Sequence, residues 1–204
     1  MTAVRDDLGG LDAPVRALFE RIAGPAAGDP PDLAAIGAAL VGLALDHDYL
    51  GRWVAQLGGE GGALPIHAPD RGPRLLMVHR PEGQMGAVHD HATWVALAPI
   101  VGLETHRRYR VVVDGDRAGD RARLELAEHR ALRTSDVATL LPPDDIHDHG
   151  HLAGLGEPAH VLIMTGDDQM RFTRNEWDLA TSRHRILPPG DRGRWLASQP
   201  WPGP

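Results

Sequence analysis

The sequence predicts a mainly β protein, an antiparallel barrel or sandwich preceded by a helical region. Apolar residues recur with the helical period in roughly the first sixty residues. From about Ala63 onward the chain changes to short β-rich runs that are separated by turn residues. Strands at such spacing are typical of an antiparallel sandwich or barrel. At 204 residues, the chain has the length of one domain with a full core.

Three helices are predicted before the barrel. Asp12 and Pro14 form a typical helix start, and we expect Gly24 to end this first helix. A second helix begins after Asp32, and a short third helix follows it. The apolar positions at helical spacing are Val15, Leu18, Phe19, Ile22, then Leu33, Ile36, Leu40, Leu43, then Tyr49, Leu50, Trp53, Val54 and Leu57. The glycine-rich segment 58–62 then interrupts the pattern.

The barrel region contains six predicted strands. They cover residues 74–80, 87–100, 103–113, 122–132, 137–141 and 160–165. We expect a hairpin connection at 114–120, where the chain carries Asp-Gly, and a tight turn at 142–145 that leads into another strand. One more hairpin is expected over 172–186, turning near 179–182, and a loose tail over 198–204.

These elements predict one structural domain with three parts. The parts are an N-terminal helical region over 1–62 that packs on the barrel, the barrel itself over 63–170, and a C-terminal hairpin and tail over 171–204. Unpaired sheet edges would also suit a homodimer.

Charge and composition exclude several classes of function. There are 21 basic and 28 acidic residues, the net charge is −7, and no basic run offers a phosphate-binding stripe. We therefore expect no nucleic-acid partner and no membrane partner. The chain has no cysteine, so any metal must be held by histidine or carboxylate. Without a signal-like start or a run of about 18 apolar residues, we expect a soluble cytoplasmic protein.

His89 and His91 are separated by a single residue. On a strand this spacing places both imidazoles on the same face, about 7 Å apart at Cα. Because the flanking segments 85–88 and 94–100 are largely apolar, a buried pair there would need polar partners, and a metal ion satisfies both. The alternative is a solvated polar strand face. Further along the chain, spacing alone does not choose a third ligand among His147, His149 and His151.

The sequence resembles both motifs of the cupin proteins. The first motif is matched by Gly83, His89, His91, Val95 and Gly102, and the second by Asp136, Pro142, Asp144 and His147. Val95 stands where many cupins have a metal-binding Glu, and acids replace the two glycines of the second motif. The resemblance implies a cupin double-stranded β-helix, or jelly-roll, barrel. It also implies a divalent metal held by His89, His91 and His147, with His149 and His151 beside the metal or at the surface.

A cupin with three histidines and no Glu resembles one branch in particular, the cysteine dioxygenase-like thiol dioxygenases. The resemblance covers about residues 73–166 and includes the segments 75–78, 82–91 and 102–104. In that family three histidines hold Fe(2+), the substrate thiolate and amine bind the iron, and dioxygen adds both its atoms to sulfur to give a sulfinate. The resemblance implies a non-haem iron oxygenase that acts on dioxygen and a small thiol or other chelating metabolite.

The chain departs from that family in its substrate-binding residues. The family's carboxylate-binding Arg has no match in segment 63–67, and its alternating His and Tyr are replaced by Ile163 and Thr165. The cysteine that cross-links to this Tyr in some members corresponds to Ala96. We therefore expect a substrate other than cysteine.

Other residues are candidates for these roles. If the histidine pair faces the barrel interior, strand alternation places Thr93 and Val95 on the same face. Arg80 or Arg74 would bind a substrate carboxylate from the neighbouring strand, unless both lie at the surface in water. The candidates are Arg80, Arg74 and Thr93 for substrate binding, and Thr165, Glu104 and His151 for catalysis. We expect His106, His129, His160 and His184 to be ordinary hydrogen-bonded histidines.

Two other functions fit the same residues. A non-redox metal such as Zn, Mn or Ni would support an isomerase, lyase or hydrolase through a polarised carbonyl. His149, His151 and Glu104 are then the candidate bases. In the other alternative, the metal only holds a small molecule, and the protein is a binding module.

Overall fold

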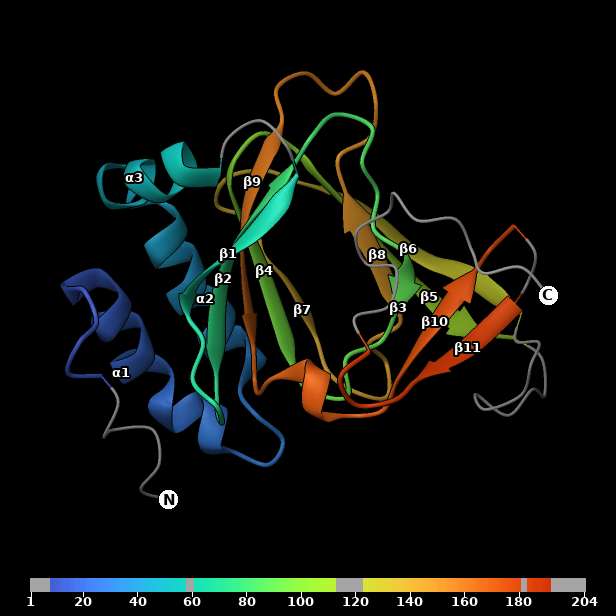
Figure 1. The fold of residues 1–204 in the computed structure, drawn as a ribbon, viewed down its shortest axis with the longest axis horizontal. Helices are drawn as coiled ribbons and strands as arrows, with labels where there is room; N and C mark the ends of the chain where they lie inside the picture. The colour runs from blue at the N-terminus through green and yellow to red at the C-terminus, as the bar shows by residue number, and fades with distance from the viewer. Residues whose placement is uncertain (1–7, 58–60, 113–122, 181–182, 192–204) are drawn as a thin grey trace.

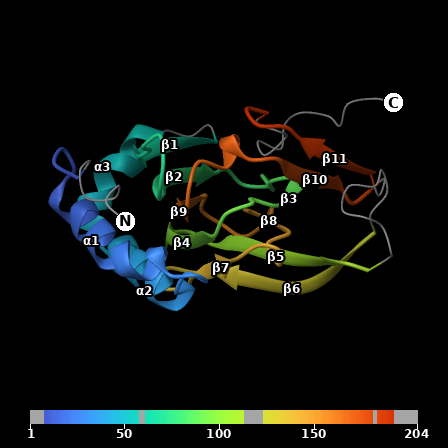
Figure 2. The ribbon, with the colours of Figure 1, turned by 90° about the horizontal axis from the view of Figure 1, so that it is seen from below.

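The computed structural model describes residues 8–57, 61–112, 123–180 and 183–191, and these confirm the predicted fold class. In this part of the chain, three helices precede eleven strands, which form two antiparallel sheets. The helices lie on the outer side of one sheet, and the other sheet lies on the side away from them (Figure 1). The two sheets form the walls of a jelly-roll barrel, as the view turned by 90° also shows (Figure 2).

The helices are α1 (Ala13–Ala27), α2 (Leu33–Ala44) and α3 (His47–Leu57). Asp32 starts α2 as predicted, because its side chain accepts a hydrogen bond of 3.0 Å from the backbone N–H of Ala35. The predicted end of α1 at Gly24 is wrong. A glycine ends a helix by adopting a left-handed conformation, which Gly24 does not, and α1 continues to Ala27. None of these helices is long and apolar enough alone to cross a membrane, although α2 and α3, bent by 80°, pass that test together.

The two sheets have five and six strands in the described residues. The five-stranded sheet has the order β1 (Gly62–His67), β2 (Arg74–Arg80), β9 (Ala159–Thr165), β4 (Val95–Val101) and β7 (Ala138–Leu140). The six-stranded sheet has the order β11 (Arg183–Leu187), β10 (Arg174–Asp178), β3 (Val88–His89), β8 (His147–Gly150), β5 (Glu104–Val111) and β6 (Leu124–Leu132). The expected C-terminal hairpin is formed by β10 and β11. The expected connection at 114–120, the tail at 198–204 and most of the glycine-rich segment lie outside the described residues.

The predicted single strand over 87–100 is wrong. It divides into β3 and β4, which belong to different sheets. The chain crosses between the sheets at residues 90–94, where Ala92 takes a positive φ of 58° and Thr93 lies in a bend. A change of sheet needs such a break because strand pleating holds a continuous strand in one sheet.

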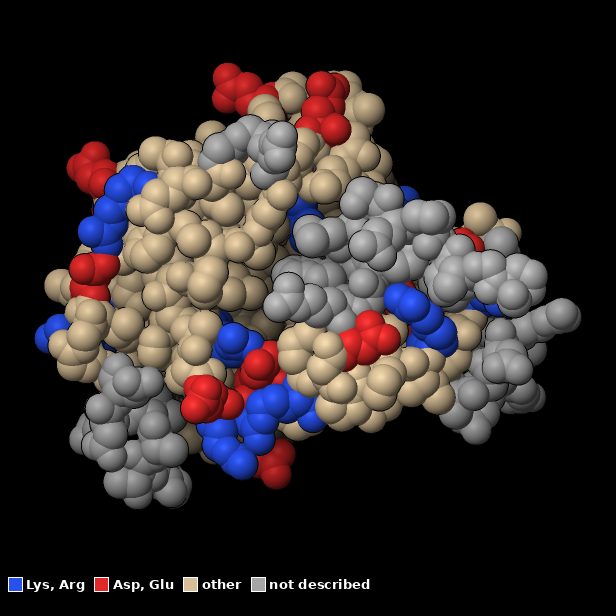
Figure 3. Space-filling model, in the orientation of Figure 1, with Lys and Arg blue, Asp and Glu red and all other residues tan. Residues whose placement is uncertain are grey.

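The barrel has one apolar wall and one polar wall. Alternate residues of the five-stranded sheet point outward and pack on the helices, among them Ala96, Ala98, Leu162 and Met164. The residues between them form a second apolar cluster, which includes Val78, Val95, Leu97, Val161 and Ile163. The opposite wall, from the six-stranded sheet, carries buried histidines and the buried carboxyl group of Glu104. The outer surface differs from this interior, since acidic and basic side chains are scattered over the face shown in Figure 3, mixed at its left and lower edges and acidic alone at its top.

Candidate metal centre

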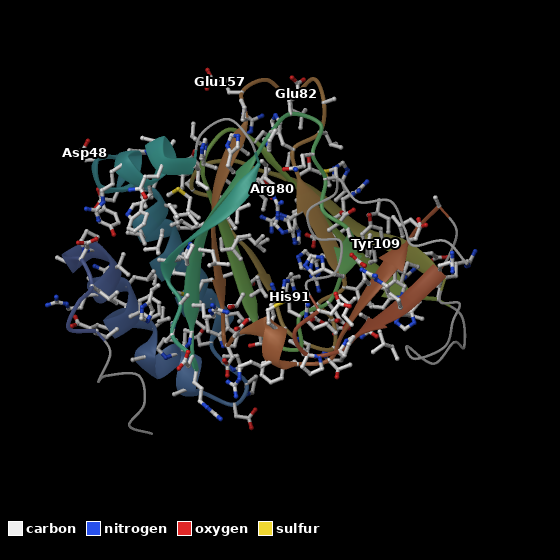
Figure 4. The ribbon with its side chains drawn as sticks, viewed as in Figure 1. Asp48, Arg80, Glu82, His91, Tyr109 and Glu157 are labelled. Carbon is white, nitrogen blue, oxygen red and sulfur yellow. The ribbon has the colours of Figure 1, made fainter. Side chains whose placement is uncertain are left out.

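Three histidines converge in the polar wall of the barrel. His89 on β3 faces His147 on β8 as a cross-strand pair, and His91 is the second residue after the end of β3. Their ligand atoms all lie within 4.8 Å of one another, and Nε2 of His89 is 3.2 Å from Nε2 of His91. All three side chains are buried, and His91 points into the space between the sheets (Figure 4). The structure thus brings together the three residues named from the sequence as ligands.

Backbone carbonyl groups orient two of these rings. Nδ1 of His89 donates to the carbonyl of Ala87 at 2.8 Å, and Nδ1 of His147 donates to the carbonyl of Asp145 at 2.9 Å. Because a carbonyl oxygen only accepts, the proton of each ring is on Nδ1, and Nε2 carries a lone pair. Nε2 of His147 is buried and has no hydrogen-bond partner among the described residues. Histidine ligands of metals are typically oriented in this way.

Burial keeps the three imidazoles neutral. It lowers the pKa of His89 to about 3, and it holds the pKa values of His91 and His147 well below the usual range, with smaller contributions from neighbouring charges. A metal ligand must be deprotonated, so these residues need no proton loss near neutral pH. Three neutral imidazoles that face one another with free nitrogen lone pairs fit a divalent transition metal.

A second buried network lies beside the triad. Nη2 of Arg80 donates to Nε2 of His149 at 3.3 Å, and Nδ1 of His149 donates to Oε1 of Glu104 at 2.6 Å. His149 thus links a guanidinium to a carboxylate. The side chain of Arg80 is 1% exposed and forms no ion pair within 4.0 Å in the described part of the chain. Arg80 is therefore a buried cation whose nearest acid is separated from it by an imidazole.

Burial also changes the acidity of this network. It raises the pKa of Glu104 to about 7, against the opposing effect of the Arg80 charge. It lowers the pKa of Arg80, and it holds the pKa of His149 well below the usual range. A carboxyl group with a pKa near 7 can hold or release a proton at neutral pH.

His106 is a site residue that the sequence did not identify. It forms a cross-strand pair with His149, and its ring centroid is 5.3 Å from that of His147. Both its nitrogens are buried without a hydrogen-bond partner among the described residues. Burial lowers its pKa to about 3. The sequence could have indicated this role, because His106 lies two residues after Glu104 and strand alternation places both side chains on one face of β5.

The remaining sequence candidates make hydrogen bonds or ion pairs outside the triad. Arg74 forms an ion pair of 2.5 Å with Asp168, at the end of β2 opposite Arg80. The hydroxyl of Thr165 donates to the carbonyl of Asp167 at 2.9 Å. Nδ1 of His151 donates to the carbonyl of Leu103 at 2.7 Å. These three side chains are each held by a contact of their own.

Thr93 does not share a strand face with the histidine pair, so that expectation is wrong. Thr93 was expected to share a strand face with His89 and His91, but it lies in the bend before β4, with its hydroxyl against Gly166. Val95 does point into the barrel, from the wall opposite the histidines. Strand alternation cannot be counted across the break at Ala92. Val95 points into the interior as a residue of β4 in the five-stranded sheet, and it does not share a strand face with the two histidines.

Comparison with known proteins gives matches only among solved structures. No family model and no curated protein matches the chain. An uncharacterized conserved protein with a double-stranded β-helix domain from Klebsiella pneumoniae subsp. pneumoniae is 16% identical, over 53% of this chain and 74% of its own, with a TM-score of 0.40. The DMSP lyase DddQ from Ruegeria pomeroyi is 14% identical, over 56% of this chain and 50% of its own, with a TM-score of 0.37.

A third match is hydroquinone 1,2-dioxygenase PnpCD in complex with Cd²⁺ and 4-hydroxybenzonitrile. It is 13% identical, over 56% of this chain and 69% of its own, with a TM-score of 0.41. Several further matches are described as cupin proteins.

Proposed function

We propose that this chain is a metal-dependent oxygenase that binds iron through His89, His91 and His147 and acts on a small chelating metabolite. The observation that carries the proposal is the convergence of three buried, neutral imidazoles whose ligand atoms lie within 4.8 Å of one another. The resemblance to the thiol dioxygenase branch of the cupins supports iron as the metal. When bound, a redox-active divalent ion with three neutral ligands would keep its double charge and leave positions open for a chelating substrate and dioxygen.

The surrounding residues support an anionic substrate. Arg80 is buried beside the triad, and within the described residues its guanidinium makes one hydrogen bond, to a neutral imidazole. Burying a guanidinium without an acid in contact is unfavourable, and a substrate carboxylate would provide that partner through a paired hydrogen bond. The apolar wall around Val95, Leu97 and Ile163 would exclude water from the opposite side of the substrate. Arg80 thereby takes the role for which segment 63–67 offers no arginine.

One observation favours a second candidate, a lyase or isomerase with a non-redox metal. Such reactions need a general base, and Glu104 has a pKa of about 7 at the end of a hydrogen bond from Nδ1 of His149. In this case Glu104 would accept the substrate proton through His149. The two candidates differ in whether dioxygen is consumed.

The deciding experiment is metal analysis of protein purified without oxygen, followed by oxygen uptake with a panel of thiols and chelating acids. Iron in the protein and oxygen uptake with a panel member would support the oxygenase. Turnover of a chelating acid by the Zn- or Mn-loaded protein, without oxygen uptake, would favour the second candidate. Oxygen uptake with none of the panel in the iron-loaded protein would count against the oxygenase.

A further inference from the structure

The segment that carries two of the three proposed ligands has few strand contacts of its own. β3 is two residues long and pairs with β8 only through His89 and His147. His91 lies outside the strand, and its backbone N–H donates to Oδ2 of Asp145 at 2.8 Å. On the other side, β3 pairs with β10 of the C-terminal hairpin. Before β3, the backbone N–H of Gly86 donates to the carbonyl of His149 at 2.9 Å, so side-chain contacts matter most after β3, at residues 90 and 91.

Two short hydrogen bonds join Asp90, the residue between the two ligands, to Asn175 on β10. The backbone N–H of Asn175 donates to Oδ1 of Asp90 at 2.7 Å, and the side-chain amide of Asn175 donates to Oδ2 at 2.6 Å. In return, the backbone N–H of Asp90 donates to the carbonyl of Asn175 at 3.2 Å. Asp90 is 6% exposed, so these hydrogen bonds act in a buried setting where they are strong.

The amide of Asn175 is fixed in turn by the other strand of the hairpin. Oδ1 of Asn175 lies 2.9 Å from Nε2 of His184 on β11. Since the amide nitrogen of Asn175 already donates to Asp90, Oδ1 is the acceptor, and Nε2 of His184 must be the donor. Donation therefore runs in one direction, from His184 to Asn175 and from Asn175 to the carboxylate of Asp90.

We propose that His184, Asn175 and Asp90 form a clasp through which the C-terminal hairpin positions His89 and His91 for metal binding. The inference rests on the proposed metal site, and it assigns these three as positioning residues that do not touch the metal. Through the clasp, the last hairpin of the six-stranded sheet determines the spacing of two ligands that lie next to Asp90, 85 residues before Asn175. His184 then has a specific role, whereas the sequence favoured an ordinary histidine.

The test measures the affinity of the full chain for Zn²⁺ by competition with a chromophoric chelator, together with the visible spectrum of the Co²⁺ form. Asn175→Ala should weaken Zn²⁺ binding by about ten- to a hundredfold, as is usual for residues that orient metal ligands. It should also change the Co²⁺ spectrum, which reports on ligand geometry. Ile186→Thr is the matched control, since Ile186 is the cross-strand neighbour of Asn175 and is 48% exposed. This control should bind Zn²⁺ like the parent.

A second pair of variants separates positioning from folding. His184→Gln keeps an N–H donor toward Asn175 and should retain most of the affinity, whereas His184→Ala should lose it in part. If Asn175→Ala does not fold, this pair decides, and equal affinity in both variants overturns the clasp. Parental affinity and an unchanged Co²⁺ spectrum in Asn175→Ala would overturn it directly. A parent that binds no metal would overturn the proposed function, and the clasp with it.

Discussion

His149 lies between Arg80 and Glu104, accepting a hydrogen bond of 3.3 Å from the guanidinium and donating one of 2.6 Å to the carboxylate. The two charged groups are thus held apart inside the barrel, next to the three histidines that converge on one point. This arrangement leaves the buried guanidinium of Arg80 available for an anionic ligand. The carboxyl group of Glu104 has a pKa of about 7 in this setting.

The first prediction concerns the role of Arg80. Arg80→Met should not lower the free energy of unfolding, because it removes a buried charge that has no acid in contact. It should raise KM about tenfold or more for an acid substrate found in the panel, through loss of a charged hydrogen bond. Chemical denaturation and steady-state kinetics measure the two effects. The control is Arg74→Met, which removes a partly exposed ion pair with Asp168 and should leave KM nearly unchanged.

A loss of about 3 kcal/mol of stability in Arg80→Met, with KM unchanged, would show that Arg80 serves the fold and not the substrate.

The second prediction concerns the pH dependence of stability. The pKa of Glu104 is raised from 4.5 to about 7, so between these pH values the folded state binds more protons at this group than the unfolded state. The contribution of Glu104 to the free energy of unfolding therefore decreases as pH rises from about 4.5 to 7, by about 3 kcal/mol at most. Above pH 7 this contribution is constant. Glu104→Gln does not titrate. Its stability relative to the parent should therefore increase over this pH range.

The measurement is urea unfolding of the metal-free parent and of Glu104→Gln at pH 5, 6, 7 and 8. The buried histidines have lowered pKa values and give the opposite slope in both proteins, so only the difference between the two reports on Glu104. The groups that face Glu104 are Arg80, His149 and His151, and all of them remain in the variant. A difference that stays constant across these pH values would contradict the raised pKa.

The third prediction concerns Val95, which the motif resemblance aligns with a metal-binding Glu of many cupins. Val95 is fully buried and points into the barrel from the apolar wall. Val95→Glu should bind metal at least as well as the parent while losing most substrate-dependent oxygen uptake, because the carboxylate would occupy a position that substrate and dioxygen need. Without metal, the buried carboxylate is unfavourable by several kcal/mol, so folding should depend more on metal than in the parent.

Thermal melting with and without Fe²⁺ or Zn²⁺, together with oxygen uptake, tests this prediction. Parental activity and no greater dependence on metal would show that Val95 does not face the metal. A variant that loses both metal binding and activity would point instead to a damaged barrel.

The sequence predicted the fold class and the pair His89 and His91 because both depend on local patterns. Strand periodicity and the spacing of this histidine pair can be read without knowing how the strands pair. The third histidine, His147, was chosen among three only through the resemblance to the second cupin motif. The break at Ala92 could not be read in this way, since alanine has no preference for a positive φ. As a result, one strand was predicted where the chain changes sheets.

The surroundings of the triad depend on contacts between distant segments. Arg80 and His149 are 69 residues apart and meet across the barrel, and His106 reaches His147 only through the register of β5 on β8. Asn175 is 85 residues from Asp90. Register and sheet order are tertiary properties, which a single sequence does not specify locally. For that reason a surface position for Arg80 stayed open at the level of sequence, and His106 was predicted to be an ordinary histidine.

The central claim is that His89, His91 and His147 hold one metal ion, and the most direct test is the metal content of anaerobically purified variants. The account predicts about one metal ion per chain in the parent, a sharp loss in His147→Ala, and nearly full content in His149→Ala, because two imidazoles rarely hold a divalent ion tightly. Full metal content in His147→Ala, with loss in His149→Ala, would contradict the assignment and place the third ligand two residues further along β8.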